Sequence, residues 1–139
     1  LMIWEFQTEA DGVPQEGDVM TTISMVYDRN LICGFEMLGH AGYSKNGEPD
    51  IVCSALSAIS QMTINAILDW TGLSPEDVKC FEQDAKQGHL LFLLNDTYCN
   101  GLVTQQLLNA FHMYTDLLEQ TYPDNIKKER REIYDYTDK

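Results

Sequence analysis

The sequence has few basic residues. Nine Lys and Arg stand against 22 Asp and Glu, which gives a formal net charge of −13 at pH 7. Proteins that bind nucleic acid neutralise phosphates with a basic surface, so this balance argues against a direct nucleic-acid partner. It is compatible with a basic peptide or protein partner, because opposite charges steer association, although acidity alone mainly reports solubility.

The sequence also lacks the cysteine patterns of disulfide scaffolds and of zinc sites. Its four cysteines include no CxxC pair, and no ligand spacing typical of a structural metal is present. We therefore expect reduced thiols, no cofactor, no metal ion and a cytoplasmic location. A zinc site built from His40, Cys53 and a further cysteine is the alternative that remains open.

No segment has the character of a membrane anchor or of a leader peptide. Residues 51–68 carry no charge, but they include six hydroxyl or amide side chains: Ser54, Ser57, Ser60, Gln61, Thr63 and Asn65. That is too many polar groups for a lipid-spanning helix, so we expect a helix buried inside the domain and no membrane partner. The first six residues have no basic region and already contain Glu5, which argues against a signal peptide.

Two β-hairpins are predicted from the apolar runs and the turn residues between them. Residues 20–27 and 31–38 form the first hairpin, and residues 75–86 and 89–95 form the second. The uninterrupted apolar run at residues 90–94 predicts a strand that is either covered on both faces or hidden in an interface.

One helix is predicted after each hairpin. The first begins after the N-cap Asp50 and ends at Gly72, and the second lies between Gly101 and Pro123. The apolar stripe of the first helix consists of Ala55, Ile59, Met62, Ala66 and Trp70. The apolar stripe of the second helix consists of Val103, Leu107, Ala110, Tyr114 and Leu117. The prediction is an α+β fold of order ββαββα, an antiparallel sheet with two helices packed on it.

The chain divides into three parts. Residues 1–18 are predicted to be a short N-terminal extension that contains an acidic loop, and residues 19–126 to be the single domain that 139 residues allow. Residues 127–139 are a charged C-terminal tail that contains five of the nine basic residues. We expect the tail to be a solvated helix end, with contact to the acidic body or to RNA as alternatives.

One stretch of the chain holds a potential nucleophile and a potential base. His40 ends the second predicted strand, and Cys53 is the third residue of the helix that Asp50 caps. The helix dipole and a nearby imidazole would lower the pKa of the Cys53 thiol, and His40 would transfer the proton. The negative charge of Asp50 would raise the pKa of the thiol, unless its carboxylate is engaged in capping the helix. An inert buried thiol and a structural histidine are the alternatives that this spacing leaves open.

The run GHAGYSKNGEPDIVCSALSAI resembles the signature of the ribosomal-processing cysteine proteases, the Prp family. The matching positions are Gly39, His40, Ala41, Gly47, Asp50, Val52, Cys53 and Ser57. The resemblance covers about residues 20–126. Outside the motif it consists of the order of the elements, Asn65 in the first helix, and Tyr122 followed by Asn125 and Ile126. Members of this family usually begin at the first strand, so residues 1–18 have no counterpart.

This resemblance implies a cysteine endopeptidase with Cys53 as the nucleophile and His40 as the general base and acid. Such enzymes are homodimers, and they remove the N-terminal extension of the large-subunit ribosomal protein numbered twenty-seven. The backbone N–H groups at the helix start are expected to bind the oxyanion, and residues 41–49 to close over the peptide.

The other matching residues have supporting roles under this hypothesis. Asp50 is expected to act as the helix cap, and Ser57 to pack or to hydrogen-bond the catalytic pair. Gly39 and Gly47 are expected to serve backbone geometry or the close approach of substrate. The remaining cysteines and histidines, Cys33, Cys80, Cys99, His89 and His112, are expected to be structural or solvated.

Two other functions remain open at this stage. One is a non-catalytic acidic protein that binds or chaperones a basic ribosomal protein, which an unreactive Cys53 would favour. The other is a different thiol-dependent enzyme that transfers an acyl group, which product analysis would separate from a protease.

Overall fold

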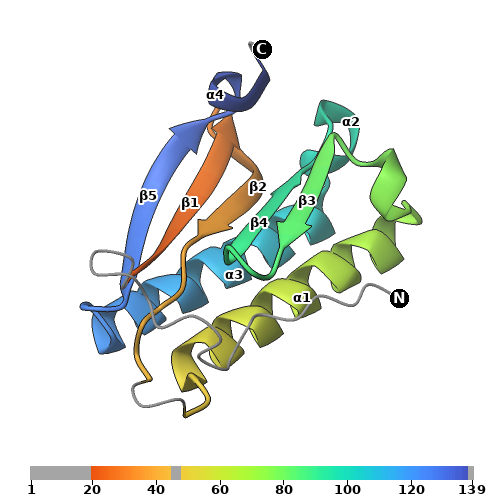
Figure 1. Cartoon of the computed structure of the whole chain (residues 1–139). Coiled ribbons are helices and arrows are strands. Elements are labelled where there is room, and N and C mark those ends of the chain that lie inside the picture. The colour runs from red at the N-terminus through yellow and green to blue at the C-terminus, as the bar shows by residue number, and fades with distance from the viewer. Residues whose placement is uncertain (1–19, 45–47, 138–139) are drawn as a thin grey trace.

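The computed structural model describes residues 20–44 and 48–137 and places a five-stranded sheet against two long helices (Figure 1). The strands are β1 (Thr21–Asp28), β2 (Leu31–Leu38), β3 (Cys80–Asp84), β4 (His89–Leu93) and β5 (Ile126–Glu132). The long helices are α1 (Ile51–Thr71) and α3 (Leu102–Thr121). The short helical elements are η1 (Pro75–Asp77), α2 (Asp96–Cys99) and α4 (Tyr134–Thr137).

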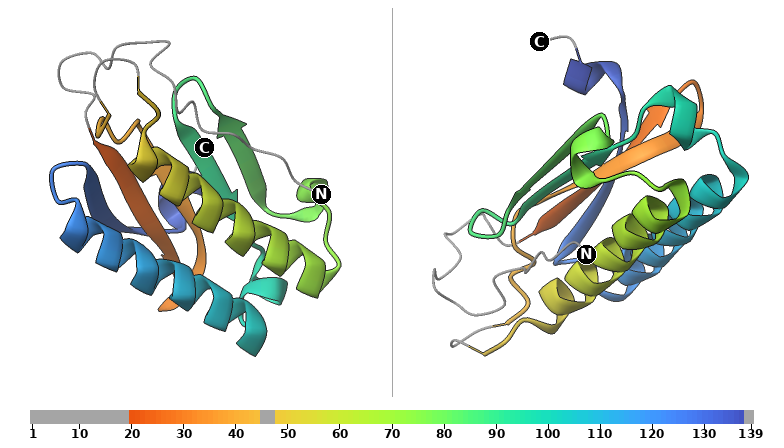
Figure 2. Two further views of the ribbon diagram at one scale, coloured as in Figure 1. Left: turned by 90° about the horizontal axis from the view of Figure 1, so that it is seen from below. Right: turned by 90° about the vertical axis from the view of Figure 1, so that its right-hand side faces the viewer.

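Strand order in the sheet is β3-β4-β2-β1-β5, and both long helices lie side by side on one face of it (Figure 2). The core lies between these two layers. The rings of Phe35 on β2 and Phe111 on α3 stack with centroids 4.0 Å apart, and Phe92 on β4 lies 6.0 Å from Phe35. The predicted α+β class and the two hairpins are confirmed, but the second hairpin is shorter than predicted, because Pro75–Asp77 form η1 and β3 begins at Cys80.

Strand β5 corrects the prediction in two respects. It pairs with β1 in parallel, with Ile126 opposite Thr21, so the sheet is mixed and not purely antiparallel. It also occupies residues that the sequence analysis assigned to a solvated tail. The edge position explains why the strand was missed, because an edge strand rich in Lys, Arg and Glu has no apolar alternation to reveal it.

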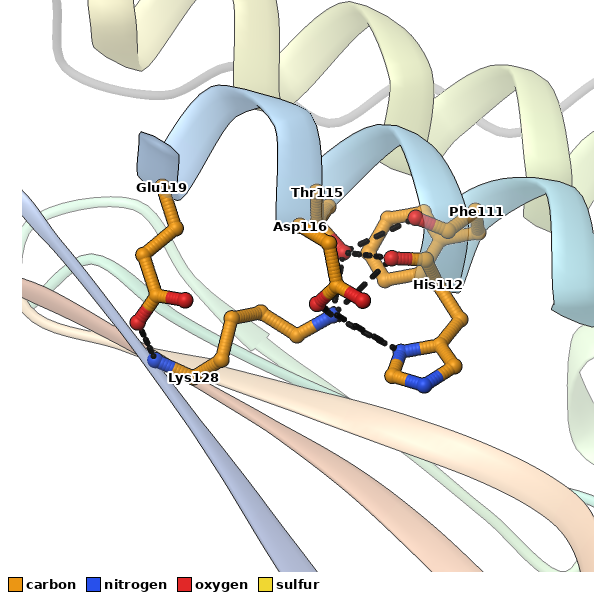
Figure 3. A network of polar contacts seen from close by, with 6 residues as sticks. All are labelled: Phe111, His112, Thr115, Asp116, Glu119 and Lys128. Carbon is orange, nitrogen blue, oxygen red and sulfur yellow. Dashed lines mark hydrogen bonds and ion pairs between the residues drawn. The ribbon is translucent and has the colours of Figure 1, made fainter. Parts of the chain in front are cut away.

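Lys128 attaches β5 to α3 by its side chain and its backbone (Figure 3). Its Nζ atom lies 2.9 Å from Asp116 Oδ1, 2.7 Å from Thr115 Oγ1 and 2.9 Å from His112 Nδ1. Its backbone N–H donates to Glu119 Oε2 over 2.8 Å. Burial of this cluster lowers the pKa of both Lys128 and His112 below their ordinary values.

The buried faces of the two long helices differ from the predicted apolar stripes. Met62 and Trp70 of the α1 stripe are exposed, as are Tyr114 and Leu117 of the α3 stripe. The faces that pack inward contain buried hydroxyl side chains instead: Ser57, Ser60, Thr63, Thr104 and Thr115. Three of these hydroxyls donate to a carbonyl of the preceding helical turn, those of Ser60, Thr63 and Thr115, so they are satisfied without water.

Helix α1 is long and apolar enough to cross a membrane by length and composition alone. Half of its most apolar stretch is buried inside the structure, as expected for the core helix of a domain. The apolar run at residues 90–94 is buried by the rest of the chain. Of the two alternatives, a strand covered on both faces or one hidden in an interface, the structure shows the first. The predicted N-terminal extension, residues 1–18, lies outside the described residues.

Candidate active site

Asp50 forms the start of helix α1, as its position in the sequence predicted. Its Oδ1 atom accepts hydrogen bonds from the backbone N–H groups of Val52 and Cys53, over 2.9 and 3.0 Å. Its Oδ2 atom accepts two more, from Tyr43 and Ser44, over 2.9 and 3.2 Å. One buried carboxylate therefore ties the first turn of the helix to the segment that follows His40.

The residue that follows His40 lies against the thiol. The backbone N–H of Ala41 donates to Cys53 Sγ over 3.3 Å, so the residue next to His40 contacts the sulfur directly. The side-chain amide of Asn125 holds the same residue from the other side, by donating to the Ala41 carbonyl over 2.9 Å. The backbone next to His40 thus lies against the sulfur of Cys53.

Gly39 allows the turn that precedes the histidine. Its φ of +94° is in the left-handed region, and a Cβ atom there would lie 2.5 Å from the Met20 carbonyl oxygen. Thr21 Oγ1 donates to the Gly39 carbonyl over 2.9 Å, and this fixes the loop to the first residue of β1. The expectation that Gly39 serves backbone geometry is met here, whereas Gly47 lies outside the described residues.

The imidazole of His40 is directed to the turn between β3 and β4. Its Nε2 atom lies 2.9 Å from the backbone carbonyl oxygen of Lys86. The same turn accepts a hydrogen bond from the Gly39 N–H at the carbonyl of Gly88, over 3.0 Å. The histidine is therefore positioned by a turn 46 residues away in the chain, which its sequence neighbourhood does not reveal.

The pKa of Cys53 runs opposite to the prediction. Burial raises it from 9.0 to about 11, the Ala41 N–H lowers it, and the charge of Asp50 raises it again. The N–H groups at the helix start were expected to lower the pKa of the thiol. They have little effect on it because the first of them already donate to Asp50. In this structure the thiol is protonated at neutral pH, with 1% of Cys53 exposed.

The predicted oxyanion donors are also engaged. The N–H groups of Val52 and Cys53 donate to Asp50, and the N–H of Ser54 donates to the Asp50 carbonyl over 2.9 Å. Ser57 is buried one turn further along, where its hydroxyl accepts a hydrogen bond from Gln61 Nε2 over 2.7 Å. This contact agrees with the packing role expected for Ser57.

Two residues that the resemblance noted without a role lie at this site. Asn125 holds the Ala41 carbonyl, and its own carbonyl accepts the N–H of Thr21 over 2.9 Å. The ring of Tyr122 meets the ring of Tyr43 edge to face, with centroids 5.3 Å apart. The end of α3 and the start of β5 thus support the loop that joins His40 to Cys53.

The other cysteines do not form a second site. All four are free, and Cys33 and Cys99 are buried in the core. Cys80 is partly exposed on strand β3, and its thiol donates to Glu82 over 3.3 Å. Within residues 20–44 and 48–137, no group of three or more His, Cys, Asp or Glu is arranged to hold a metal ion. The arrangement supports thiol chemistry at Cys53, with a proton carrier at His40.

Residues 20–127 match the family model described as cysteine protease Prp. Two curated relatives, each named ribosomal processing cysteine protease Prp, come from two strains of Staphylococcus aureus. Each is 29% identical to this chain over 109 residues, which covers 78% of this chain and 96% of the relative.

Solved structures agree with this match. A crystal structure of the essential ribosomal processing protease Prp from S. aureus, in complex with a covalently linked product peptide, aligns with a TM-score of 0.67 and 26% identity. It covers 81% of this chain and 100% of that one. The crystal structure of SMU.848 from Streptococcus mutans has a TM-score of 0.70 and 21% identity, covers 85% of this chain and 99% of that chain, and shows the same fold.

Proposed function

This chain belongs to the cysteine protease Prp family, and we propose that it removes the N-terminal extension of a large-subunit ribosomal protein, the one numbered twenty-seven. In this proposal Cys53 is the nucleophile and His40 is the general base and acid. The observation that carries it is the hydrogen bond from the Ala41 N–H to Cys53 Sγ, which brings the residue after His40 into contact with the thiol.

The mechanism begins with transfer of the Cys53 proton to His40, which leaves a thiolate and an imidazolium. The Ala41 N–H stabilises this thiolate, since it lowers the pKa of the thiol in the resting structure. The thiolate attacks the scissile carbonyl, and His40 returns the proton to the departing amine. Water then attacks the acyl-enzyme with His40 as the base, and this step restores the free thiol.

Access to the sulfur requires a conformational step. Cys53 is 1% exposed, and the segment over it is held by Asp50 through Tyr43 and Ser44. We propose that the substrate displaces residues 41–44, so that the sulfur is exposed only when a peptide is bound. Such a gate protects the thiol from other reagents and keeps the resting enzyme inactive.

The substrate class follows from charge and from the relatives. A net charge of −13 is complementary to a basic ribosomal protein and would steer it to the enzyme. The S. aureus protease is named for ribosomal processing and was crystallised with a substrate peptide, at 25% identity to this chain. Both observations support a ribosomal protein as the substrate here.

A homodimer is part of the proposal, as is a cytoplasmic location for an enzyme with four free cysteines. Several large apolar side chains point outward from the paired helices: Met62, Trp70, Leu102, Met113, Tyr114 and Leu117. A two-fold contact is self-complementary, so a second copy would cover this face with the same face. Light scattering should show that the double variant Met62→Lys/Met113→Lys is a monomer. Tyr134→Lys is the control: it changes an exposed residue on α4 and should leave the dimer intact.

The decisive experiment for the reaction uses the full-length ribosomal protein and intact mass spectrometry. The wild-type enzyme should trim it once near the N-terminus, and Cys53→Ala should not. Cys80→Ala is the matched control, because it removes a more accessible thiol and should keep full activity. Tight binding with no change in mass would contradict the protease for this substrate and favour an acidic binding protein. Transfer of an acyl group to another acceptor would favour the second alternative.

A further inference from the structure

The hydrogen bond at Nε2 indicates the tautomer of the neutral His40 ring. A backbone carbonyl oxygen can only accept, so the Nε2 atom that lies 2.9 Å from the Lys86 oxygen carries the proton. A neutral imidazole has one N–H group. The Nδ1 atom therefore holds the lone pair, and it is the basic nitrogen of the ring.

The turn that supplies this carbonyl is joined to the histidine loop at a second point. The Gly88 carbonyl accepts the Gly39 N–H over 3.0 Å, one residue before His40. Gly88 has a φ of +64°, and a Cβ atom there would lie 2.9 Å from the Gly39 oxygen and 3.2 Å from His40 Cε1. The backbone of the turn thus packs close to the imidazole ring, and the positive φ and the nearby Gly39 oxygen favour glycine at this position.

Asp84 holds this turn in shape. Its Oδ1 atom accepts hydrogen bonds from the N–H groups of Lys86 and Gln87, over 3.1 and 3.3 Å. The N–H of Gly88 closes the turn by donating to the Ala85 carbonyl over 3.2 Å. A change at the exposed side chain of Asp84 would therefore alter the direction of the Lys86 carbonyl without touching the core.

We propose that the β3–β4 turn is the third component of the catalytic machinery. The Lys86 carbonyl holds His40 in the Nε2–H tautomer, so that Nδ1 exchanges the proton with Cys53, and Asp84 is a positioning residue that orients the carbonyl. This inference rests on the proposed function, in which Cys53 and His40 react as a pair. It assigns to a backbone carbonyl the orienting role that a side chain has in catalytic triads.

The proton balance is as follows. Nδ1 takes the proton of Cys53 Sγ, which gives a thiolate and an imidazolium whose Nε2–H still donates to the Lys86 oxygen. The thiolate forms its bond to the scissile carbon, and the Nδ1 proton goes to the amine as the peptide bond breaks. The Nε2 proton stays on the ring throughout, in its hydrogen bond to the Lys86 oxygen.

The direct test is the nitrogen chemical shifts of His40 in the free enzyme. Long-range ¹H–¹⁵N spectra at a pH above the titration of the ring should show Nε2 protonated and Nδ1 unprotonated, with His40→Gln used to assign the signals. A dominant Nδ1–H tautomer would overturn the inference. Because this measurement needs no substrate, its result is independent of whether the protein cleaves the ribosomal protein.

Three variants on the edge strand then test the positioning role. Asp84→Ala should reduce kcat about three- to tenfold with little change in KM, and should mix the two tautomers of His40. Asp84→Asn keeps the accepting Oδ1 atom and should restore both properties. Glu82→Ala removes a carboxylate from the same strand, away from the turn, and should have no effect. Unchanged tautomer signals in Asp84→Ala, or equal losses in Glu82→Ala, would overturn the role of Asp84.

Discussion

The backbone amide of Ala41 donates to the sulfur of Cys53 over 3.3 Å, although the two residues are twelve positions apart in the chain. This bond places the residue after His40 against the thiol. It also stabilises the thiolate, because the pKa of Cys53 is raised by burial and by Asp50 but lowered by this N–H group. In the resting structure the sulfur is therefore buried against the Ala41 amide, with its pKa raised to about 11.

Alkylation should report this enclosure. A pKa raised from 9.0 to about 11 lowers the thiolate fraction at neutral pH about a hundredfold. Cys80 has a pKa of about 11 as well but is partly exposed, so iodoacetamide should modify Cys80 well before Cys53. Peptide mapping over time, with Cys80→Ala as the control, measures both rates. Rapid modification of Cys53 at pH 7 would contradict a buried resting thiol.

This expectation changes the meaning of an unreactive cysteine. The sequence analysis took slow alkylation of Cys53 as support for a non-catalytic binder. The structure predicts slow alkylation for the protease as well, because Cys53 is buried and the pKa of its thiol is raised. Cleavage of substrate, and not reactivity toward a small reagent, therefore separates the two functions.

Replacing Asp50 should affect both stability and activity. In Asp50→Asn one of the two carboxylate oxygens becomes an NH₂ group, which cannot accept a hydrogen bond. The variant therefore loses either the bonds from the Tyr43 and Ser44 amides or the bonds from the helix start. We expect the free energy of unfolding to fall by about 1–3 kcal/mol, measured by urea denaturation. The kcat/KM for the ribosomal protein should fall more than this loss of stability explains.

The matched control for Asp50 is Asp77→Asn. Asp77 also accepts a backbone hydrogen bond at the start of a helical turn, from Ser74, but it is exposed and outside the site. It should leave kcat/KM unchanged. Equal activity losses in the two variants would mean that Asp50 has no special relation to the loop.

Asn125 should be needed for the position of Ala41. Asn125→Asp replaces the donor that holds the Ala41 carbonyl by a charged acceptor, so the two oxygens would repel each other. We expect kcat/KM to fall about tenfold or more, with a smaller change in the free energy of unfolding. Asn100→Asp, at an exposed position after α2, is the control. Full activity of Asn125→Asp would show that the Ala41 carbonyl does not need this donor.

Much of the fold could be predicted because its signals are local. Apolar runs marked the two hairpins, and Asp50 and Gly72 marked the ends of the first helix. Strand β5 could not be predicted in this way, because Lys127 and Arg131 are typical of solvated segments and the partner strand is a hundred residues away. The inward faces of the helices were missed because buried serine and threonine hydroxyls donate to their own helix.

The site was predictable only in part for a related reason. His40, Asp50 and Cys53 lie in one short stretch, so their spacing and their resemblance to a family motif identified them. The contacts of Lys86 and Asn125 come from residues 46 and 84 positions away. No local pattern marks a backbone carbonyl as a partner, and the pKa of Cys53 depends on burial that spacing does not report.

Stability should decline on mild acidification through His112. Burial and the nearby Lys128 ammonium lower the pKa of His112 below its ordinary value of 6.5, so the unfolded chain binds a proton at higher pH than the folded protein does. The contribution of neutral His112 to the free energy of unfolding is therefore complete above about pH 6.5, and it is lost as the pH falls below that value. Urea denaturation at pH about 7.5 and about 5.5 should show this decline.

The variants identify the residue responsible. His112→Gln should reduce the decline, since glutamine does not titrate. His89→Gln removes the histidine that is paired with Glu36 on the sheet and should leave the His112 contribution in place. An unchanged pH dependence in His112→Gln would contradict this assignment.

The most direct test of the central claim is covalent capture with a reagent that binds as the substrate does. A peptide with the sequence of the proposed ribosomal extension, ending in a chloromethyl ketone at the scissile position, should alkylate Cys53 and leave Cys80 unmodified. This is the reverse of the order expected for iodoacetamide, because only the peptide opens the segment over the sulfur. His40→Gln should slow the capture. Modification of Cys80 in preference to Cys53 would contradict the account.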